Sequence, residues 1–133
     1  MRLIKPSRLD RAYRQRAKQS AKRAQKRHKE RMLRYADSLV REIVYKRDGG
    51  LCRACGRKVK LHGHLLDVMH AHHVIYRSAQ GSDAPSNRLS TCASCHEAEH
   101  HGLLWMKGQP NSVMTFTRVD ANGRILNTWE SRV

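Results

Sequence analysis

The sequence has few aromatic residues and no long hydrophobic segment. One Phe, two Trp and four Tyr in 133 residues leave little material for a large hydrophobic core. The chain therefore has room for one compact domain with extensions, and bound metal would compensate for a thin core. No apolar run is long enough to cross a bilayer, and the first residues lack the apolar part of a secretory signal. We expect a cytoplasmic protein with no membrane partner.

The chain also lacks any cysteine outside two short pairs. Cys52/Cys55 and Cys92/Cys95 are both Cys-x-x-Cys. In a reducing compartment this pattern is typical of metal sites and not of disulfides. Four thiolates bind zinc tetrahedrally in a closed, structural site. Residues 56–91 separate the pairs, further than in a simple zinc finger, so folded structure must lie between them.

Acidic residues are scarce, with 11 Asp and Glu against 27 Lys and Arg, for a formal net charge of +16. Most of the excess lies in residues 1–34, where only Asp10 and Glu30 are acidic. This asymmetry favours a polyanion partner, with a solvating tail as the alternative. Nucleic acid is favoured over an anionic membrane because the segment lacks a bulky apolar face. The candidates for phosphate contact are Arg14, Arg16, Lys18, Lys22, Arg23, Lys26 and Arg27.

Helix-forming composition without Gly or Pro predicts a basic helix over residues 7–36. Apolar residues then recur at steps of three and four, which predicts an amphipathic helix that packs on a core and ends at Asp48-Gly49-Gly50. The apolar positions are Met32, Tyr35, Ala36, Leu39, Val40, Ile43 and Val44.

The rest of the chain reads as short strands and one short helix. Residues 64–76 are strand-like, residues 77–86 form a polar loop, and a helix should carry residues 95–101 and end at Gly102. Residues 112–119 and 124–129 predict a C-terminal hairpin around Asn122-Gly123. Phe116 and Trp129 are its expected packing residues.

Four histidines have the spacing of a catalytic metal site. His72 and His73 are adjacent on a predicted strand, so their side chains leave in opposite directions. His96 and His100 are four apart on the predicted helix and share a face. His72, His96 and His100 could therefore converge on one cation, with His73 beside it and unligated. A neutral imidazole can take a proton from water, and a metal can polarise a phosphate, so the parts for phosphodiester hydrolysis are present.

Three segments together resemble the HNH nucleases with the ββα-metal fold. They are residues 47–56 (RDGGLCRACG), 72–78 (HHVIYRS) and 87–96 (NRLSTCASCH). The resemblance covers roughly residues 38–102, and it rests on the order, spacing and type of the residues together.

The resemblance implies an α+β fold in which a small ββα-metal motif is inserted in a four-cysteine zinc knuckle. We expect a basic helical extension over residues 1–36, the nuclease domain over 37–104 and the C-terminal β-hairpin over 105–133. It also implies DNA as substrate in a bacterial or phage-infected host cell. Small free-standing phage members of similar size assist a terminase, so a terminase or mobile-element complex is a candidate protein partner.

Site roles also follow from the resemblance. His73 matches the general base, and Asn87 matches the residue that braces the loop and orients that base. His72 and His96 match metal ligands, and His100 matches a further ligand of some members. Arg77 stands where a phosphate contact would be useful. An imidazole-rich site suits Zn²⁺, Ni²⁺, Mn²⁺ or Co²⁺, with Mg²⁺ as a further candidate.

Two other interpretations stay open at this point. One is a non-catalytic zinc module that only binds nucleic acid through its basic helix. The other is a small subunit of a phage packaging or mobile-element complex, which is compatible with nuclease activity. No motif specifies an oligomeric state.

Overall fold

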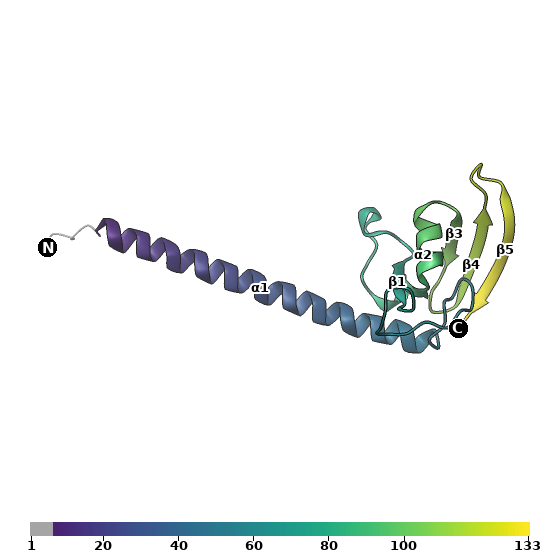
Figure 1. Ribbon diagram of the computed structural model, residues 1–133, viewed down its shortest axis with the longest axis horizontal. Helices are drawn as coiled ribbons and strands as arrows, with labels where there is room; N and C mark the ends of the chain where they lie inside the picture. The colour runs from purple at the N-terminus through teal and green to yellow at the C-terminus, as the bar shows by residue number, and fades with distance from the viewer. Residues whose placement is uncertain (1–6) are drawn as a thin grey trace. The chain divides into compact units, whose positions relative to one another are not determined.

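The computed structural model describes residues 7–133, and the chain divides into two compact units at residues 36 and 37. Its mixture of helices and short strands agrees with the predicted α+β class (Figure 1). The elements in order are α1 (Arg8–Arg47), β1 (His70–His73), η1 (Arg77–Ala79), η2 (Pro85–Asn87), β2 (Arg88–Thr91), α2 (Ala93–His100), β3 (Leu104–Gly108), β4 (Val113–Val119) and β5 (Ile125–Arg132).

The two predicted helical segments are one continuous helix, α1. Its first turn is capped reciprocally: Ser7 Oγ accepts from the Asp10 backbone at 3.1 Å, and Asp10 Oδ2 accepts from the Ser7 backbone at 3.0 Å. At the other end Gly49 and Gly50 adopt positive φ angles of 64° and 66°. Their N–H groups bond back to carbonyls of the last helical turn, so the predicted stop at Asp48-Gly49-Gly50 is confirmed.

The contact face of α1 within residues 37–47 is narrower than the apolar pattern predicts. Val44 is fully buried and Val40 packs beside it, whereas Leu39 and Ile43 are 43% and 52% exposed. The prediction is therefore wrong for Leu39 and Ile43, and Met32 and Tyr35 in the first unit are exposed as well. Residues 37, 40, 41 and 44 share one side of the helix, and polar contacts complete that side. Arg41 donates to the Met69 carbonyl at 2.9 Å.

Two antiparallel strands and a helix follow one another in the middle of the chain. In β1 and β2, His72 pairs with Leu89 and His73 with Arg88. Strand β1 is much shorter than the predicted 64–76, because His64 begins a turn whose carbonyl accepts from Asp67 and Val68. Helix α2 starts two residues earlier and ends one residue earlier than the predicted 95–101, and Gly102 follows shortly after its end. It lies between β1 and the C-terminal sheet in Figure 1 and contacts both.

The C-terminal region is a three-stranded antiparallel sheet in the order β3-β4-β5. The predicted hairpin is present as β4 and β5, but the expectation of a hairpin alone is wrong because β3 pairs with the other edge of β4. Strand β3 has five residues and only Leu104 is buried, so its pattern is weak. Phe116 and Trp129 stack at 5.8 Å, as their predicted packing role requires. Trp129 Nε1 also donates to the Ala54 carbonyl at 2.8 Å and ties the sheet to the cysteine loop.

The core is small and includes three of the four cysteines. Its buried side chains come from α1, the cysteine loop, the segment between that loop and β1, β2, α2 and the C-terminal sheet. They are Val44, Cys52, Ala54, Val59, Met69, Leu89, Cys92, Cys95, Leu104, Met114 and Phe116. Among the described residues no helix combines the length and the apolar character that spanning a membrane requires.

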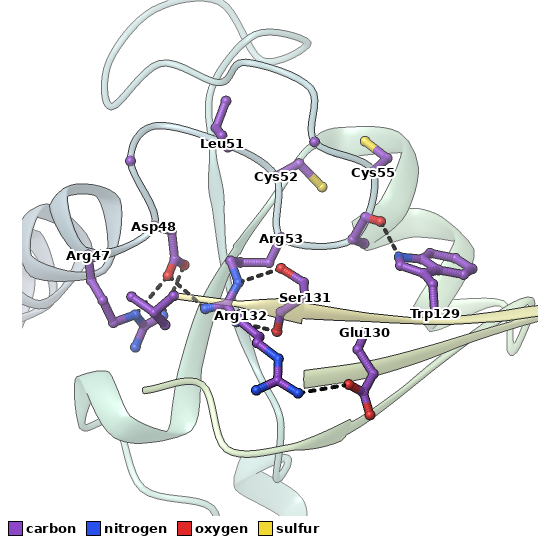
Figure 2. Close-up of a pocket in the computed structure, with 14 residues that line it drawn as sticks. Arg47, Asp48, Leu51, Cys52, Arg53, Cys55, Trp129, Glu130, Ser131 and Arg132 are labelled. Carbon is purple, nitrogen blue, oxygen red and sulfur yellow. Dashed lines mark hydrogen bonds and ion pairs between the residues drawn. The ribbon is translucent and has the colours of Figure 1, made fainter. Parts of the chain in front are cut away.

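A buried carboxylate joins the elements around this core. Asp48 accepts from Arg47 Nε at 2.7 Å, from Arg53 Nη1 at 3.1 Å and from the backbone N–H of Ser90 at 2.7 Å. Figure 2 shows the two arginines turned toward this carboxylate, with Arg53 continuing to Ser131 on β5. A charge so deeply buried is tolerated only when it is paired and hydrogen-bonded. Asp48 thus connects the end of α1, the cysteine loop and β2, and through Arg53 it reaches the C-terminal sheet.

Replacing this carboxylate should destabilise the fold strongly. Asp48→Ala leaves the buried Arg53 without its counter-charge, so we expect a loss of about 3–5 kcal/mol in unfolding free energy. Urea unfolding followed by circular dichroism measures it. Asp67→Ala is the matched control, because Asp67 forms only an exposed ion pair with Lys60 and should cost less than about 1 kcal/mol. Equal losses for the two variants would contradict the structural role of Asp48.

Candidate functional site

The four cysteine thiols form one cluster. Cys52 and Cys55 come from the loop after α1, and Cys92 and Cys95 come from the start of α2. The four sulfur atoms all lie within 4.8 Å of one another, and those of Cys55 and Cys92 are 3.7 Å apart. A disulfide would bring two sulfurs to about 2.05 Å. Two thiolates on one tetrahedral zinc lie about 3.8 Å apart, given Zn–S bonds of about 2.3 Å. The observed spacing therefore fits a shared metal and not a disulfide.

Three of the four thiols have shifted pKa values. Hydrogen bonding from Cys95 lowers the pKa of Cys52 to about 5. The neighbouring Cys52 thiol and burial both raise the pKa of Cys95. Burial also raises the pKa of Cys55. One thiolate is therefore favourable, and further thiolates in the same small volume require a positive charge among them.

Three histidines form a second cluster beside the first. Strand β1 places His72, and α2 places His96 and His100, so that one ring nitrogen of each lies within 4.8 Å of the others. The Nδ1 atoms of His72 and His96 are 3.3 Å apart. Two nitrogens on one tetrahedral metal are about 3.3 Å apart, given metal–nitrogen bonds of about 2.0–2.1 Å. The donor set and its spacing therefore fit a nitrogen-bound divalent metal.

Two histidines of the cluster have lowered pKa values, and the cluster is open on one side. Burial is the main cause that lowers the pKa of His72 to about 4, and it does the same for His96. Both imidazoles therefore keep a free lone pair at neutral pH, as a metal ligand must. His72 is buried, His96 is half-buried and His100 is exposed. A substrate can thus approach from the His100 side.

His73 points away from this cluster, as alternation on a strand requires. Its Nε2–H donates to Asp83 Oδ1 at 2.8 Å. The same oxygen accepts from Arg77 Nε at 2.7 Å and from Arg88 Nη2 at 2.9 Å. These hydrogen bonds, led by that of His73, hold the pKa of the Asp83 carboxyl well below its usual range. His73 is therefore oriented by a carboxylate that remains charged.

Asn87 shapes the loop between β1 and β2. Its side-chain oxygen accepts from the Ile75 backbone at 2.9 Å, and its amide donates to the carbonyls of Ile75 and Ser82 at 2.9 and 2.8 Å. Gly81 lies so close that a Cβ there would come within 1.7 Å of the Ile75 carbonyl oxygen. The loop thus closes tightly on itself and carries Asp83 back toward His73.

The remaining predicted residues lie outside the two clusters. Arg77 is exposed and paired with Asp83, as described above. The seven basic candidates on residues 14–27 are all exposed on α1 in the first unit. His70, which shares a strand face with His72, stacks on His96 with ring centroids 4.6 Å apart.

Three residues at the site are missed by the sequence analysis: Tyr76, Asp83 and Glu99. Glu99 follows His96 by three positions on α2, a helical spacing that places it on the same side. Tyr76 follows the histidine doublet closely and its hydroxyl donates to Glu99 Oε1. Asp83 carries no spacing signal, because only the fold of the loop brings it to His73.

A separate pocket of about 570 Å³ lies between the cysteine loop and β5 (Figure 2). Arg47, Cys55 and Trp129 are among its lining residues, and no histidine lines it. Chemistry at the imidazoles therefore does not take place in this pocket.

Two comparisons report proteins to which this chain is similar. Residues 52–102 match the HNH endonuclease family, and this segment contains both clusters. The chain is also 29% identical over 68 residues to the type IV methyl-directed restriction enzyme EcoKMcrA of Escherichia coli (strain K12). That alignment covers 49% of this chain and 24% of the relative, so the chain spans about a quarter of the relative's length. Both findings support nuclease activity, and residues 52–102 resemble an HNH endonuclease domain.

Proposed function

We propose that the protein is a metal-dependent endonuclease that hydrolyses DNA phosphodiester bonds at the histidine cluster. The observation that carries the proposal is that two adjacent histidines of β1 lie in different surroundings. His72 lies in a cluster of three imidazoles, whereas its neighbour His73 lies outside it and is held by Asp83. A metal-dependent hydrolase needs these two functions side by side.

His72, His96 and His100 would hold one divalent cation. When bound, the cation supplies positive charge to the scissile phosphate and to the departing 3′-oxygen. Imidazole donors suit Zn²⁺, Ni²⁺, Co²⁺ or Mn²⁺, and Mg²⁺ remains a candidate through its abundance. The exposed side of the cluster at His100 gives the phosphate its access.

His73 acts as the general base. Its Nε2–H donates to Asp83, which leaves the lone pair on Nδ1 to take a proton from water. The charged Asp83 then stabilises the imidazolium that forms. Asn87 keeps the loop in the shape that brings Asp83 to His73. Arg77, exposed beside Asp83, is placed to contact a phosphate.

The cysteine cluster would hold a structural zinc ion. Its four thiolates would supply all four ligands of a tetrahedral site and leave no position open to substrate. Its role is to fix the cysteine loop to the start of α2.

The basic residues of α1 bind the DNA backbone. Seven exposed Lys and Arg side chains between residues 14 and 27 provide positive charge for phosphate contacts without base readout. A DNA substrate also fits the name of the curated relative, a methyl-directed restriction enzyme. A binding module without catalysis would leave the paired His73 and the imidazole cluster without a role.

The central test separates the base from the metal ligands. His73→Ala should keep its fold, metal content and DNA affinity, while single-turnover cleavage of supercoiled plasmid falls by about 10²–10⁴-fold. His96→Ala should instead lose metal at the imidazole cluster, with partial rescue at high metal concentration. His101→Ala is the matched control, because His101 is exposed directly after α2 and its side chain pairs with Glu97. If both test variants cut like the parent, the chain is a binding module.

Loss of one thiol should remove zinc and stability together. Cys52→Ser should lose one zinc per chain and the cooperative unfolding transition, because metal binding there contributes directly to folding. Elemental analysis and thermal unfolding measure the two effects. A folded Cys52→Ser protein with full zinc content would refute the four-thiolate assignment.

The basic helix should dominate the salt dependence of DNA binding. Replacing Arg14, Lys18, Lys22 and Arg23 by Gln in the full chain removes up to four phosphate contacts. Each should reduce the slope of log affinity against log salt by about 0.9. Fluorescence anisotropy across a salt series measures the slope. The control variant replaces Lys58, Lys107, Arg118 and Arg124, which are equally exposed but lie in the second unit. Equal slopes for both variants would show that net charge alone matters.

A further inference from the structure

Glu99 lies next to the histidine cluster, and one of its two carboxylate oxygens has no hydrogen-bond partner among the described residues. Its side chain is 13% exposed, and its Oε2 atom lies 3.4 Å from Nε2 of His72. Oε2 is buried and has no hydrogen-bond partner in the part of the chain that the structure describes. The other oxygen, Oε1, accepts the hydroxyl proton of Tyr76. A buried carboxylate oxygen without a hydrogen-bond donor destabilises the folded state, so we expect a neighbouring group to donate to it.

The imidazole of His72 can provide that donor if its ring proton is on Nε2. A neutral imidazole carries one N–H, and the other nitrogen offers a lone pair. The Nδ1 atoms of His72 and His96 lie 3.3 Å apart, the separation expected for two nitrogens on one metal. If Nδ1 of His72 offers its lone pair there, the ring proton must sit on Nε2. That is the atom that faces Glu99 Oε2.

We propose that Glu99 is a positioning residue that accepts the Nε2–H of His72 while Nδ1 of His72 binds the divalent cation. Tyr76 holds the Glu99 carboxylate in place from its other side. This inference rests on the metal site of the proposed function and names two residues that act on the metal through His72. With the proton on Nε2, His72 donates a hydrogen bond to Glu99 Oε2 and keeps its Nδ1 lone pair, beside that of His96, free for the cation.

The arrangement has consequences for metal affinity. A carboxylate behind a ligand imidazole fixes its tautomer and orientation and makes it a better donor, and loss of such a partner costs about 10–100-fold in affinity. The Tyr76 hydroxyl donates to Glu99 Oε1, so it holds the carboxylate by the oxygen that does not face His72 Nε2.

The first test measures metal binding in the full chain, with one zinc per chain retained at the cysteines. Co²⁺ is titrated into the protein and followed by its visible absorption. Glu99→Gln should bind Co²⁺ about 10–100-fold more weakly than the parent, and Tyr76→Phe should weaken it in the same direction by less. Glu97→Gln is the matched control, since Glu97 lies on the same helix, is 75% exposed and pairs with His101. Zinc content and thermal unfolding of each variant show that the fold is retained.

The second test reads the proton position and does not depend on any variant folding. Long-range ¹H–¹⁵N correlation spectra of the parent loaded with Zn²⁺ at the histidine cluster distinguish the two tautomers. His72 should carry its proton on Nε2 and its metal on Nδ1. A proton on Nδ1, or Co²⁺ affinity unchanged in a folded Glu99→Gln protein, would overturn the inference.

Plasmid cleavage on the same samples separates this inference from the proposed function. A parent that cuts DNA, with Nδ1 of His72 protonated, retains the nuclease assignment and overturns the role of Glu99. A parent that binds Co²⁺ through the predicted tautomer and loses affinity in Glu99→Gln, yet does not cut, supports Glu99 and refutes the nuclease.

Discussion

The buried charge of Asp48 is the constraint on which the second unit depends. Its carboxylate must be satisfied wherever the chain places it, and its donors come from α1, the cysteine loop and β2. Arg53, one of these donors, also binds the carbonyls of Pro110 and Ser131 and so brings in the C-terminal sheet. Elements distant in sequence are thereby fixed around one point in a protein whose apolar core is small. The cysteine loop that supplies half of the thiol cluster is one of them.

Strand β1 shows how little structure is needed to divide two chemical roles. It has four residues, yet its alternation turns His72 toward α2 and His73 toward the loop that carries Asp83. The surroundings then give the two rings different properties. Burial lowers the pKa of His72 to about 4 and keeps its imidazole neutral, whereas His73 is paired with a charged carboxylate. The opposite directions of adjacent strand residues thus place two histidines in different surroundings.

The sequence predicts the parts of this fold that follow from local spacing. The Cys-x-x-Cys pairs, the stop at Asp48-Gly49-Gly50 and the hairpin at Asn122-Gly123 depend on ligand and turn chemistry within a few residues. Strand β3 and the exposure of Leu39 and Ile43 depend on which partner surface exists, and periodicity cannot supply that. Asp83 is missed for the same reason, because a tightly closed loop brings it to His73. The roles assigned to the histidines remain predictions, although the structure places them together as their spacing requires.

Helix α2 links the two clusters, because it carries residues of both. It has eight residues, too few to be stable alone, so its position must come from its contacts. Cys92 and Cys95 attach its start to the cysteine loop, and His96 follows Cys95 directly along the chain. The position of the imidazoles therefore depends on the thiol cluster, since any shift of the helix start moves His96 and His100 with it. The dependence is mutual, because Cys92 and Cys95 move with the same helix. A cation at the cysteines would thus act on catalysis only through the geometry of α2, without contact with the substrate.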